Sequence, residues 1–250
     1  MKKVSIFNIK GGVGKTTSAL NISACLSKQG KRVLLIDLDS QANTTMTMGA
    51  YDIEALSISE LLLERDIKTK DVIRNTEIDN IDVLPSNIKL SFAERKILLD
   101  VSRSQQNRLK KALKEVENEY DYCIIDCPPS LNMITINALC ASDEVLVPVK
   151  IDKYALDGLG YLIDSVEQIK EEFNPCLTFK GCFITMDTAT TVNRKIKQEL
   201  KNALKDKLFN TTIKQNVKVI ESTFEERPVV FSSSKARASQ NYNDLCKEIF

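Results

Sequence analysis

Short unbroken runs of apolar residues alternate with longer amphipathic stretches along most of this chain. The runs are rich in Val, Ile and Leu and predict strands over residues 4–7, 33–38, 81–84, 122–126, 144–149 and 181–185. A helical period predicts helices over residues 18–29, 90–101, 105–119, 156–173, 193–208 and 236–249. Strands without polar alternation are typical of parallel sheets covered by helices on both faces. The pattern therefore predicts an α/β fold, doubly wound, with a mostly parallel sheet.

Composition is compatible with this fold and narrows the environment. The chain has 250 residues, 43% of them hydrophobic, which is enough for a sizeable core, and we expect one domain over residues 1–250. The net charge of +1 predicts no bulk attraction to nucleic acid, so such binding would need a local basic patch. The seven cysteines form no C-x-x-C pair, and no apolar run reaches the roughly 18 residues of a membrane span. We expect a cytoplasmic protein that is either soluble or peripheral.

The sequence KGGVGKTT stands at residues 10–17, between the first predicted strand and the first predicted helix. Glycines at such a junction let successive backbone N–H groups turn toward a polyphosphate, and the helix N-terminus adds its positive dipole. Lys15 would neutralise the β and γ phosphates, and the Thr16 hydroxyl would bind Mg²⁺. Ile9 stands where the pattern G-x-x-x-x-G-K-[ST] requires glycine, so this is a variant loop. The predicted phosphate-binding residues are Lys10, Gly11, Gly12, Val13, Gly14, Lys15, Thr16 and Thr17.

A second candidate lies where another predicted strand ends. Asp126 closes the apolar run 122–126, and in a doubly wound sheet the carboxyl ends of the strands share one edge, where ligands bind. A carboxylate at that edge suits a Mg²⁺ ion that is shared with phosphate oxygens. An aspartate at a strand end is alternatively a turn or cap residue. The phosphate loop favours the metal site, and Asp37 and Asp39 are expected on the same edge.

These motifs together resemble the ParA/MinD ATPases, whose phosphate loop is called a deviant Walker A motif. KGGVGKTT matches that loop, and DLDSQAN at 37–43, IIDCPPS at 124–130 and TINA at 135–138 are similar to further family segments. Likeness at 147–158 and 216–228 extends the resemblance over nearly the whole chain. The short, Soj-like ParA proteins of chromosome and plasmid partition are the most similar subgroup. The resemblance implies an ATPase that hydrolyses ATP to ADP and phosphate with Mg²⁺.

The resemblance also implies roles for the aspartates. Asp39 occupies the family's catalytic position, where it orients or activates the attacking water, and Asp37 would support the loop and the metal shell. The predicted metal-binding residues are Thr16, Asp37 and Asp126. Ser40 replaces the family's usual proline, so the segment after Asp39 loses one φ restraint. The next polar residues are either switch residues or caps of the following helix, namely Gln41, Asn43 and Thr44.

Lys10 is by default an exposed loop lysine, but the resemblance implies that it reaches across a dimer to the nucleotide of the other subunit. A cation supplied in this way stabilises phosphate charge only when two ATP-loaded subunits meet, so dimerisation and ATP occupancy would be linked. The predicted catalytic residues are therefore Lys10, Lys15 and Asp39. The family also holds adenine near the loops that contain Thr185 and Asn216, which predicts base contacts from Met186 and Asn216.

A basic segment over residues 193–218 is the candidate surface for a partner. On a helix, residues three and four apart share a face, and a basic stripe can follow a phosphate backbone without reading bases. The stripe is alternatively a solvated helix face, but the resemblance favours non-specific DNA. The predicted DNA-binding residues are Arg194, Lys195, Lys197, Lys201, Lys205, Lys214 and Lys218. Thr190 and Gln215 stand where the family commonly has arginines associated with DNA binding, so neighbouring lysines would have to compensate.

Competing functions match the sequence less well. A MinD-like membrane switch would need a basic amphipathic C-terminal helix, and residues 243–250 are short and not basic. A nitrogenase-reductase-like protein would need paired cysteines for an Fe–S cluster, whereas Cys127 is better explained as a packed residue. No motif specifies the acceptor pocket of a metabolic kinase or ligase.

The sequence as a whole predicts a ParA-like ATPase for plasmid or chromosome partition. Its ATP-bound homodimer would bind nucleoid DNA without sequence preference, and a ParB-like centromere-binding protein would stimulate hydrolysis and release. The main alternative is a ParA-like ATPase that positions a protein assembly or regulates replication initiation.

Overall fold

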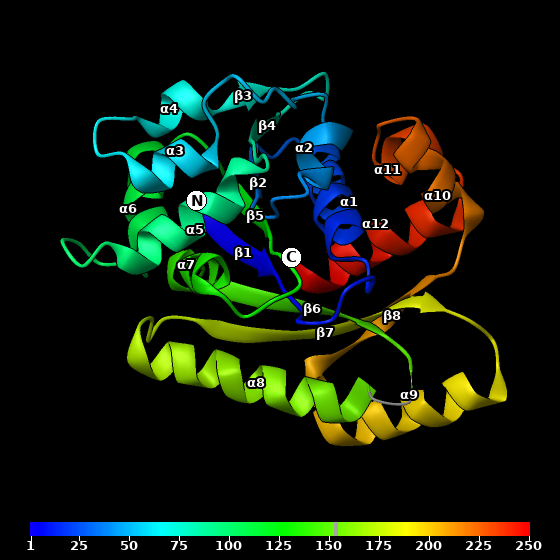
Figure 1. Cartoon of the computed structure of the whole chain (residues 1–250). Helices are drawn as coiled ribbons and strands as arrows, with labels where there is room; N and C mark the ends of the chain where they lie inside the picture. Colours follow the sequence, from blue (N-terminus) through cyan, green and yellow to red (C-terminus); the bar gives the residue numbers. More distant parts are fainter. Residues whose placement is uncertain (153–154) are drawn as a thin grey trace.

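The computed structural model describes residues 1–152 and 155–250. Lys153 and Tyr154 lie outside the described residues, within the segment 147–158 that resembles the family. The described residues form an eight-stranded sheet in the order β3-β4-β2-β5-β1-β6-β7-β8, with helices on both faces (Figure 1). Within it all neighbouring strands are parallel except β3 and β4. The predicted doubly wound α/β fold with a mostly parallel sheet is confirmed.

The elements follow one another in an alternating order along the chain. The strands are β1 (Lys2–Ile6), β2 (Val33–Asp37), β3 (Arg74–Asn75), β4 (Ile81–Leu84), β5 (Tyr122–Asp126), β6 (Glu144–Lys150), β7 (Thr178–Asp187) and β8 (Leu208–Lys214). The α-helices are α1 (Lys15–Lys28), α2 (Asn43–Thr47), α3 (Ile58–Leu63), α4 (Thr69–Val72), α5 (Lys89–Leu99), α6 (Arg108–Leu113), α7 (Met133–Ala141), α8 (Ala155–Glu172), α9 (Thr191–Leu204), α10 (Val217–Phe224), α11 (Val229–Ser232) and α12 (Arg237–Ile249). Two single 3₁₀ turns among the described residues are η1 (Lys114–Val116) and η2 (Lys205–Lys207).

Two hydrophobic cores, one on each face of the sheet, hold the layers together. In β2, Leu34 and Ile36 belong to one core, whereas Val33 and Leu35 belong to the other. Helices α3 to α9 contribute to the first core, and α1, α11 and α12 contribute to the second. Because both faces are covered, the central strands carry no polar alternation, which is why they read as unbroken apolar runs.

Two of the predicted helices are wrong in their extent. The helix predicted over 105–119 is only α6 followed by η1, and the helix predicted over 193–208 ends at Leu204. Lys205 has φ +51° and ψ −118°, a non-helical conformation that ends α9, and the chain then passes through η2 into β8 at the edge of the sheet. Only Ile213 of β8 is fully buried, so this strand lacks the apolar run that marks the central ones.

The central strands bring three segments together at the carboxyl edge of the sheet. β5 pairs with β1 on one side and β2 on the other, and Asp126 is in register with both Ile6 and Asp37. The chain continues from β1 into the 10–17 loop and from β2 into the segment that carries Asp39. These segments lie side by side only because β1, β5 and β2 are neighbours in the sheet.

Candidate active site

The loop over residues 10–17 connects β1 to α1 and turns at two glycines. Gly12 has φ +67° and Gly14 has φ +86°, both in the left-handed region that favours glycine. Gly14 is the N-cap of α1, and Thr185 donates a 2.8 Å hydrogen bond from Oγ1 to the carbonyl oxygen of Val13. The loop is thus fixed at the start of a 14-residue helix, whose unpaired N–H groups and dipole favour a phosphate.

Lys15 is the first residue of α1, and only 7% of it is exposed. Its Nζ donates a 2.8 Å hydrogen bond to the carbonyl oxygen of Lys10. Burial lowers the pKa of Lys15, while the charge of Asp126 acts in the opposite direction. A buried ammonium next to a phosphate cradle is stabilised when a phosphate oxygen replaces the neutral carbonyl as its acceptor.

Asp126 ends β5 and is 1% exposed. Thr44 donates a 2.8 Å hydrogen bond from Oγ1 to Oδ2 of Asp126, whereas the buried Oδ1 has no hydrogen-bond partner among the described residues. Burial, with the adjacent Asp37 carboxylate, raises the pKa of Asp126 to about 7, although the hydroxyls of Thr44 and Thr16 act to lower it. An unpaired carboxylate oxygen in a buried site is costly unless a ligand or ion completes it.

Asp37 ends β2 and is held on both oxygens by the segment that follows it. Oδ1 accepts a 3.0 Å hydrogen bond from the backbone N–H of Asp39, and Oδ2 accepts 2.8 and 2.7 Å bonds from the N–H and Oγ1 of Thr45. Thr45 Oγ1 in turn accepts a 2.9 Å bond from the N–H of Ser86. Burial raises the pKa of Asp37 to about 6 against these hydrogen bonds. Asp37 is therefore placed to support the segment 38–45.

The donor set fits Mg²⁺. Asp126 offers a buried oxygen with no hydrogen-bond partner among the described residues, and the Thr16 hydroxyl acts to lower the pKa of that carboxyl. Across residues 1–152 and 155–250, no three His, Cys, Asp or Glu side chains gather as a metal cage. Mg²⁺ does not need one, because it usually takes one or two protein ligands together with waters and phosphate oxygens. Of the three predicted metal residues, Thr16 and Asp126 match this role, while Asp37 already has protein donors on both oxygens.

Asp39 lies two residues beyond β2, in the turn that leads to α2. Its Oδ1 accepts a 3.0 Å hydrogen bond from the N–H of Gln41, and its carbonyl accepts a 2.9 Å bond from the N–H of Ala42. Ala42 has φ +56° and is the N-cap of α2, which has no side-chain cap. The alternative that Gln41, Asn43 or Thr44 caps this helix with its side chain is therefore wrong. Thr44 instead joins this segment to Asp126.

Lys10 turns toward its own subunit. Its Nζ lies 2.9 Å from Oδ1 of Asp152, 31% of its side chain is exposed, and its Cε would lie 3.2 Å from a Cβ added to Gly158. The ammonium is thus beside the loop but is engaged by an acid from the segment after β6. To reach another subunit's nucleotide, this side chain would have to leave Asp152.

The two predicted adenine contacts flank the same edge. Met186 has φ +50°, unusual for a residue with a side chain, and its Cε would lie 4.0 Å from a Cβ added to Gly14. Asn216 is the N-cap of α10, where its Oδ1 accepts a 2.9 Å hydrogen bond from the N–H of Lys218. Met186 is therefore next to the phosphate loop, whereas the side-chain Oδ1 of Asn216 already accepts a hydrogen bond from within the protein.

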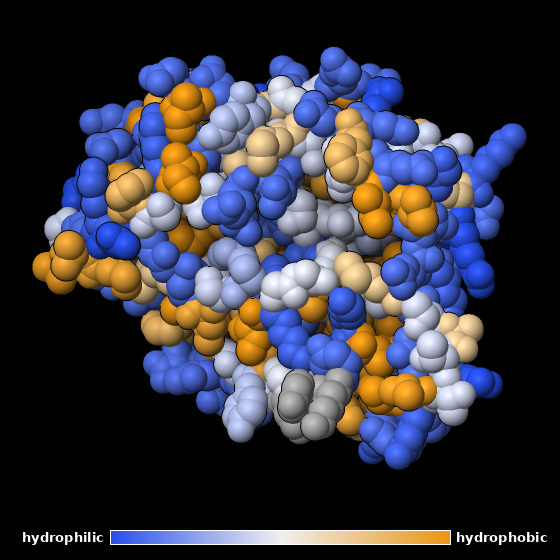
Figure 2. All heavy atoms as spheres, turned by 45° about the vertical axis from the view of Figure 1, so that its right-hand side comes forward, coloured by the Kyte–Doolittle hydropathy of each residue, from blue (hydrophilic) through white to orange (hydrophobic). Residues whose placement is uncertain are grey.

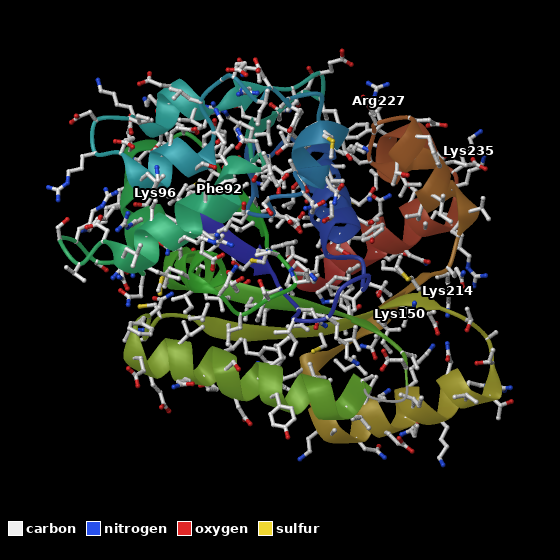
Figure 3. The ribbon with its side chains drawn as sticks, viewed as in Figure 1. Phe92, Lys96, Lys150, Lys214, Arg227 and Lys235 are labelled. Carbon is white, nitrogen blue, oxygen red and sulfur yellow. The ribbon has the colours of Figure 1, made fainter. Side chains whose placement is uncertain are left out.

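The predicted DNA-binding residues do not form one helical stripe. Arg194, Lys195 and Lys201 are exposed on α9, but Lys205 lies beyond its end and Lys218 pairs with Glu221 on α10. Arg194, Lys197 and Lys201 line a cleft between α9 and β8. Lys197 and Lys214, from α9 and β8, both bind Asp187 at the end of β7. Figure 3 shows Lys214 beside the carboxyl end of β8.

Thr190 and Gln215, at the two family arginine positions, have structural roles. Thr190 is the N-cap of α9 and accepts a 3.2 Å hydrogen bond from the N–H of Asn193, while Gln215 donates its backbone N–H to the carbonyl of Asp187. Sequence reasoning missed Thr45, Asp152 and Asp187. Asp152 and Lys10 are 142 positions apart, so no local pattern could have paired them.

The remaining surface was compared with what a membrane protein would need. No helix in the described part of the chain is long and apolar enough to cross a membrane. Figure 2, in which the side that carries α10 comes forward, shows hydrophobic groups interspersed among hydrophilic ones. The largest exposed apolar side chains on α10 are Val217, Ile220 and Phe224.

Comparisons with known proteins agree with this geometry. A protein-family profile described as an AAA domain matches residues 1–179. The chain is 40% identical over 249 residues to the sporulation initiation inhibitor protein Soj of Bacillus subtilis, covering 99% of this chain and 98% of that protein. It is 36% identical over 251 residues to the chromosome-partitioning ATPase Soj of Treponema pallidum, covering 100% and 97%. Cobyrinic acid a,c-diamide synthase of Mycobacterium smegmatis, solved with an ATP analog and magnesium, has a TM-score of 0.85 at 29% identity over 99% of this chain and 93% of that one.

Proposed function

The chain belongs to the ParA/MinD family of ATPases, close to its Soj-like ParA members, and from this we propose that its ATP cycle drives plasmid or chromosome partition. It is an ATPase that uses ATP and Mg²⁺. We propose in addition that an ATP-bound dimer, DNA and a stimulating partner protein take part in this cycle.

The nucleotide chemistry is supported above all by Oδ1 of Asp126, which is buried without a hydrogen-bond partner in the described part of the chain and lies on the edge that holds the phosphate loop. Thr16 and Asp126 would hold Mg²⁺, which neutralises phosphate charge when bound. Lys15 would exchange the Lys10 carbonyl for a phosphate oxygen. Asp39, in a turn anchored by Asp37, would orient the attacking water, since phosphoryl transfer needs positioning and charge stabilisation more than a strong base.

Lys10 supports a dimer-dependent step. In one subunit it is held by Asp152, on the rim of the site and partly exposed. We infer that ATP brings two subunits together and that each Lys10 then leaves Asp152 for the phosphates of the other subunit. The second subunit would thereby complete the charge stabilisation, which links hydrolysis to dimerisation.

The basic residues of α9 and β8 support non-specific DNA binding by the ATP-bound dimer. Arg194, Lys195, Lys197 and Lys201 on one helix can contact phosphates without reading bases. A ParB-like centromere-binding protein would stimulate hydrolysis and so release the dimer from DNA. Repeated binding and release, with nucleoid association in the ATP state, would move the cargo.

The test compares wild type with Asp39→Ala. We expect Asp39→Ala to bind ATP but hydrolyse it slowly, and so to accumulate as a dimer that retains DNA. Mass in solution and DNA binding are measured with ATP, with ADP and without nucleotide. Asp66→Ala, which removes an exposed carboxylate in the loop after α3, is the matched control and should behave as wild type.

Two outcomes would contradict parts of the proposal. If both wild type and Asp39→Ala remain monomeric with ATP, the dimer switch is wrong. If the ATP dimer forms but retains no DNA at low salt, partition through DNA is wrong, and the alternative of positioning a protein assembly or regulating replication initiation is favoured.

A further inference from the structure

Asp187 is a buried carboxylate that receives two ammonium groups. Its side chain is 0% exposed, and its Oδ2 accepts hydrogen bonds from Lys197, at 2.7 Å, and from Lys214. Thr212 Oγ1 donates a third bond of 2.9 Å to the same oxygen. The Oδ1 atom is buried without a hydrogen-bond partner among the described residues. We call Asp187, Lys197 and Lys214 the lysine clasp.

The clasp joins three elements at the edge of the basic surface, by which we mean Arg194, Lys195, Lys197 and Lys201 of α9 together with Lys214 of β8. Asp187 ends β7, Lys197 lies on α9 and Lys214 ends β8. About 30% of the Lys197 side chain and 29% of the Lys214 side chain remain exposed, so both ammonium groups can still meet a ligand. Burial acts to raise the pKa of Asp187, but the hydrogen bonds from Lys197, Lys214 and Thr212 outweigh it and hold this pKa below its ordinary value. The carboxylate is therefore ionised.

The charge of the clasp is smaller than its lysines suggest. Two ammonium groups and one carboxylate leave a net charge of about +1, because Asp187 is bound directly to both cations. A phosphate that approaches the two lysines also meets the carboxylate behind them, and like charges at this range repel. The positions that could have added arginines are taken by Thr190, a helix cap, and by Gln215. Lys197 and Lys214 are two of the seven basic residues predicted to bind DNA, and Asp187 reduces the net charge of this pair.

We propose that Asp187 limits the affinity of the basic surface for the phosphates of DNA by neutralising one of its two clasped lysines. This inference rests on the proposed DNA binding. It assigns Asp187 a specific effect on affinity that differs from merely fastening α9 and β8 to β7. Weak binding would allow the protein to leave DNA readily after ATP hydrolysis.

The test is Asp187→Asn, measured as binding to duplex DNA of unrelated sequence with ATP and Mg²⁺ over a range of salt. Each added phosphate contact changes the slope of log K against log[salt] by about −0.9. Removing one neutralising charge should steepen the slope by about that amount. It should also tighten binding about fivefold to tenfold near 0.1 M salt.

Asp206→Asn is the matched control, because it removes one exposed carboxylate from η2, next to the same surface. We expect it to change the slope by less than half as much. Asp187→Asn leaves two ammonium groups without a counter-charge and can lower stability. The same comparison is therefore made between Lys197→Gln and the double variant Asp187→Asn/Lys197→Gln, in which only Lys214 remains to be released. Their slopes should also differ by about 0.9.

The outcomes separate this inference from the proposal it rests on. If neither wild type nor any Asp187 variant retains DNA with ATP, both are wrong. If wild type binds DNA and removal of Asp187 leaves slope and affinity unchanged in both backgrounds, only the inference is wrong. Equal shifts for Asp206→Asn and Asp187→Asn would also overturn it, since total charge would then explain the effect. A lower unfolding temperature with an unchanged slope would assign Asp187 a fastening role alone.

Discussion

Replacing Asp126 by Asn should make the nucleotide-free protein more stable at pH 8 while abolishing Mg²⁺-dependent ATP hydrolysis. The carboxylate is 1% exposed, has one oxygen without a partner among the described residues, and is adjacent to Asp37. Asparagine keeps the shape and can still accept the Thr44 hydrogen bond, but it removes the buried charge. The substitution therefore separates what the site needs for function from what the fold tolerates.

The magnitude follows from the pKa. Burial and the Asp37 charge raise the pKa of Asp126 from 3.8 to about 7, and each pH unit corresponds to about 1.4 kcal/mol. Ionising this group in the folded protein therefore costs up to about 4 kcal/mol, and we expect about 2–3 kcal/mol to be regained because asparagine pairs imperfectly. The pKa of Asp126 is higher in the folded protein than in the unfolded chain. Between about pH 4 and pH 7 the folded state therefore binds more protons than the unfolded state. Wild-type stability should fall as the pH rises through this window, and the advantage of Asp126→Asn should grow over the same window.

The assay is urea unfolding followed by circular dichroism at pH 4.5 and pH 8, with nucleotide and divalent cations removed. Asp79→Asn, which changes an exposed aspartate, is the control and should match wild type at both pH values. If Asp126→Asn is no more stable than wild type at pH 8, or if its advantage is the same at both pH values, the buried charge of Asp126 does not destabilise the folded protein.

Further predictions concern packing and hydrogen bonds, all measured as free energies of unfolding in urea. Gly181→Ala should cost about 2–3 kcal/mol, because the new Cβ would lie 2.6 Å from the Lys207 carbonyl oxygen. The control Gly160→Ala, on α8, has open space around the new Cβ and should cost nothing. Equal unfolding midpoints for the two variants would contradict this. Thr45→Val should cost about 2–4 kcal/mol, since it removes a donor to Asp37 and an acceptor for Ser86, and a cost below 1 kcal/mol would argue against that network. Tyr242→Phe should cost about 1 kcal/mol, because it leaves the buried Ser18 hydroxyl without its 3.2 Å partner, and an unchanged midpoint would show that this bond contributes nothing.

Local pattern was sufficient for the parts of the protein whose physical cause is local. The central strands are unbroken apolar runs because helices cover both faces of the sheet, so β2, β5 and β6 could be predicted. The phosphate loop could be predicted because its glycines, lysine and threonine are contiguous at a strand–helix junction. Edge strand β8 could not be predicted, because an exposed edge needs few apolar residues and its basic neighbours extend the helical pattern of α9.

The fold class, the phosphate loop and the aspartates at the strand ends could all be predicted from the amino-acid order, because each depends on residues that are neighbours in the chain. The hydrogen-bond and ion-pair partners of the polar side chains, in contrast, depend on how the chain folds. Within residues 1–152 and 155–250, one oxygen of Asp126 has no hydrogen-bond partner, whereas Thr45 donates to Asp37 and Lys10 pairs with Asp152. The fold also places Asp187 beneath Lys197 and Lys214. These contacts join residues that are distant in sequence. They are determined by burial and by the order of the strands, because both fix the distances between the charged groups.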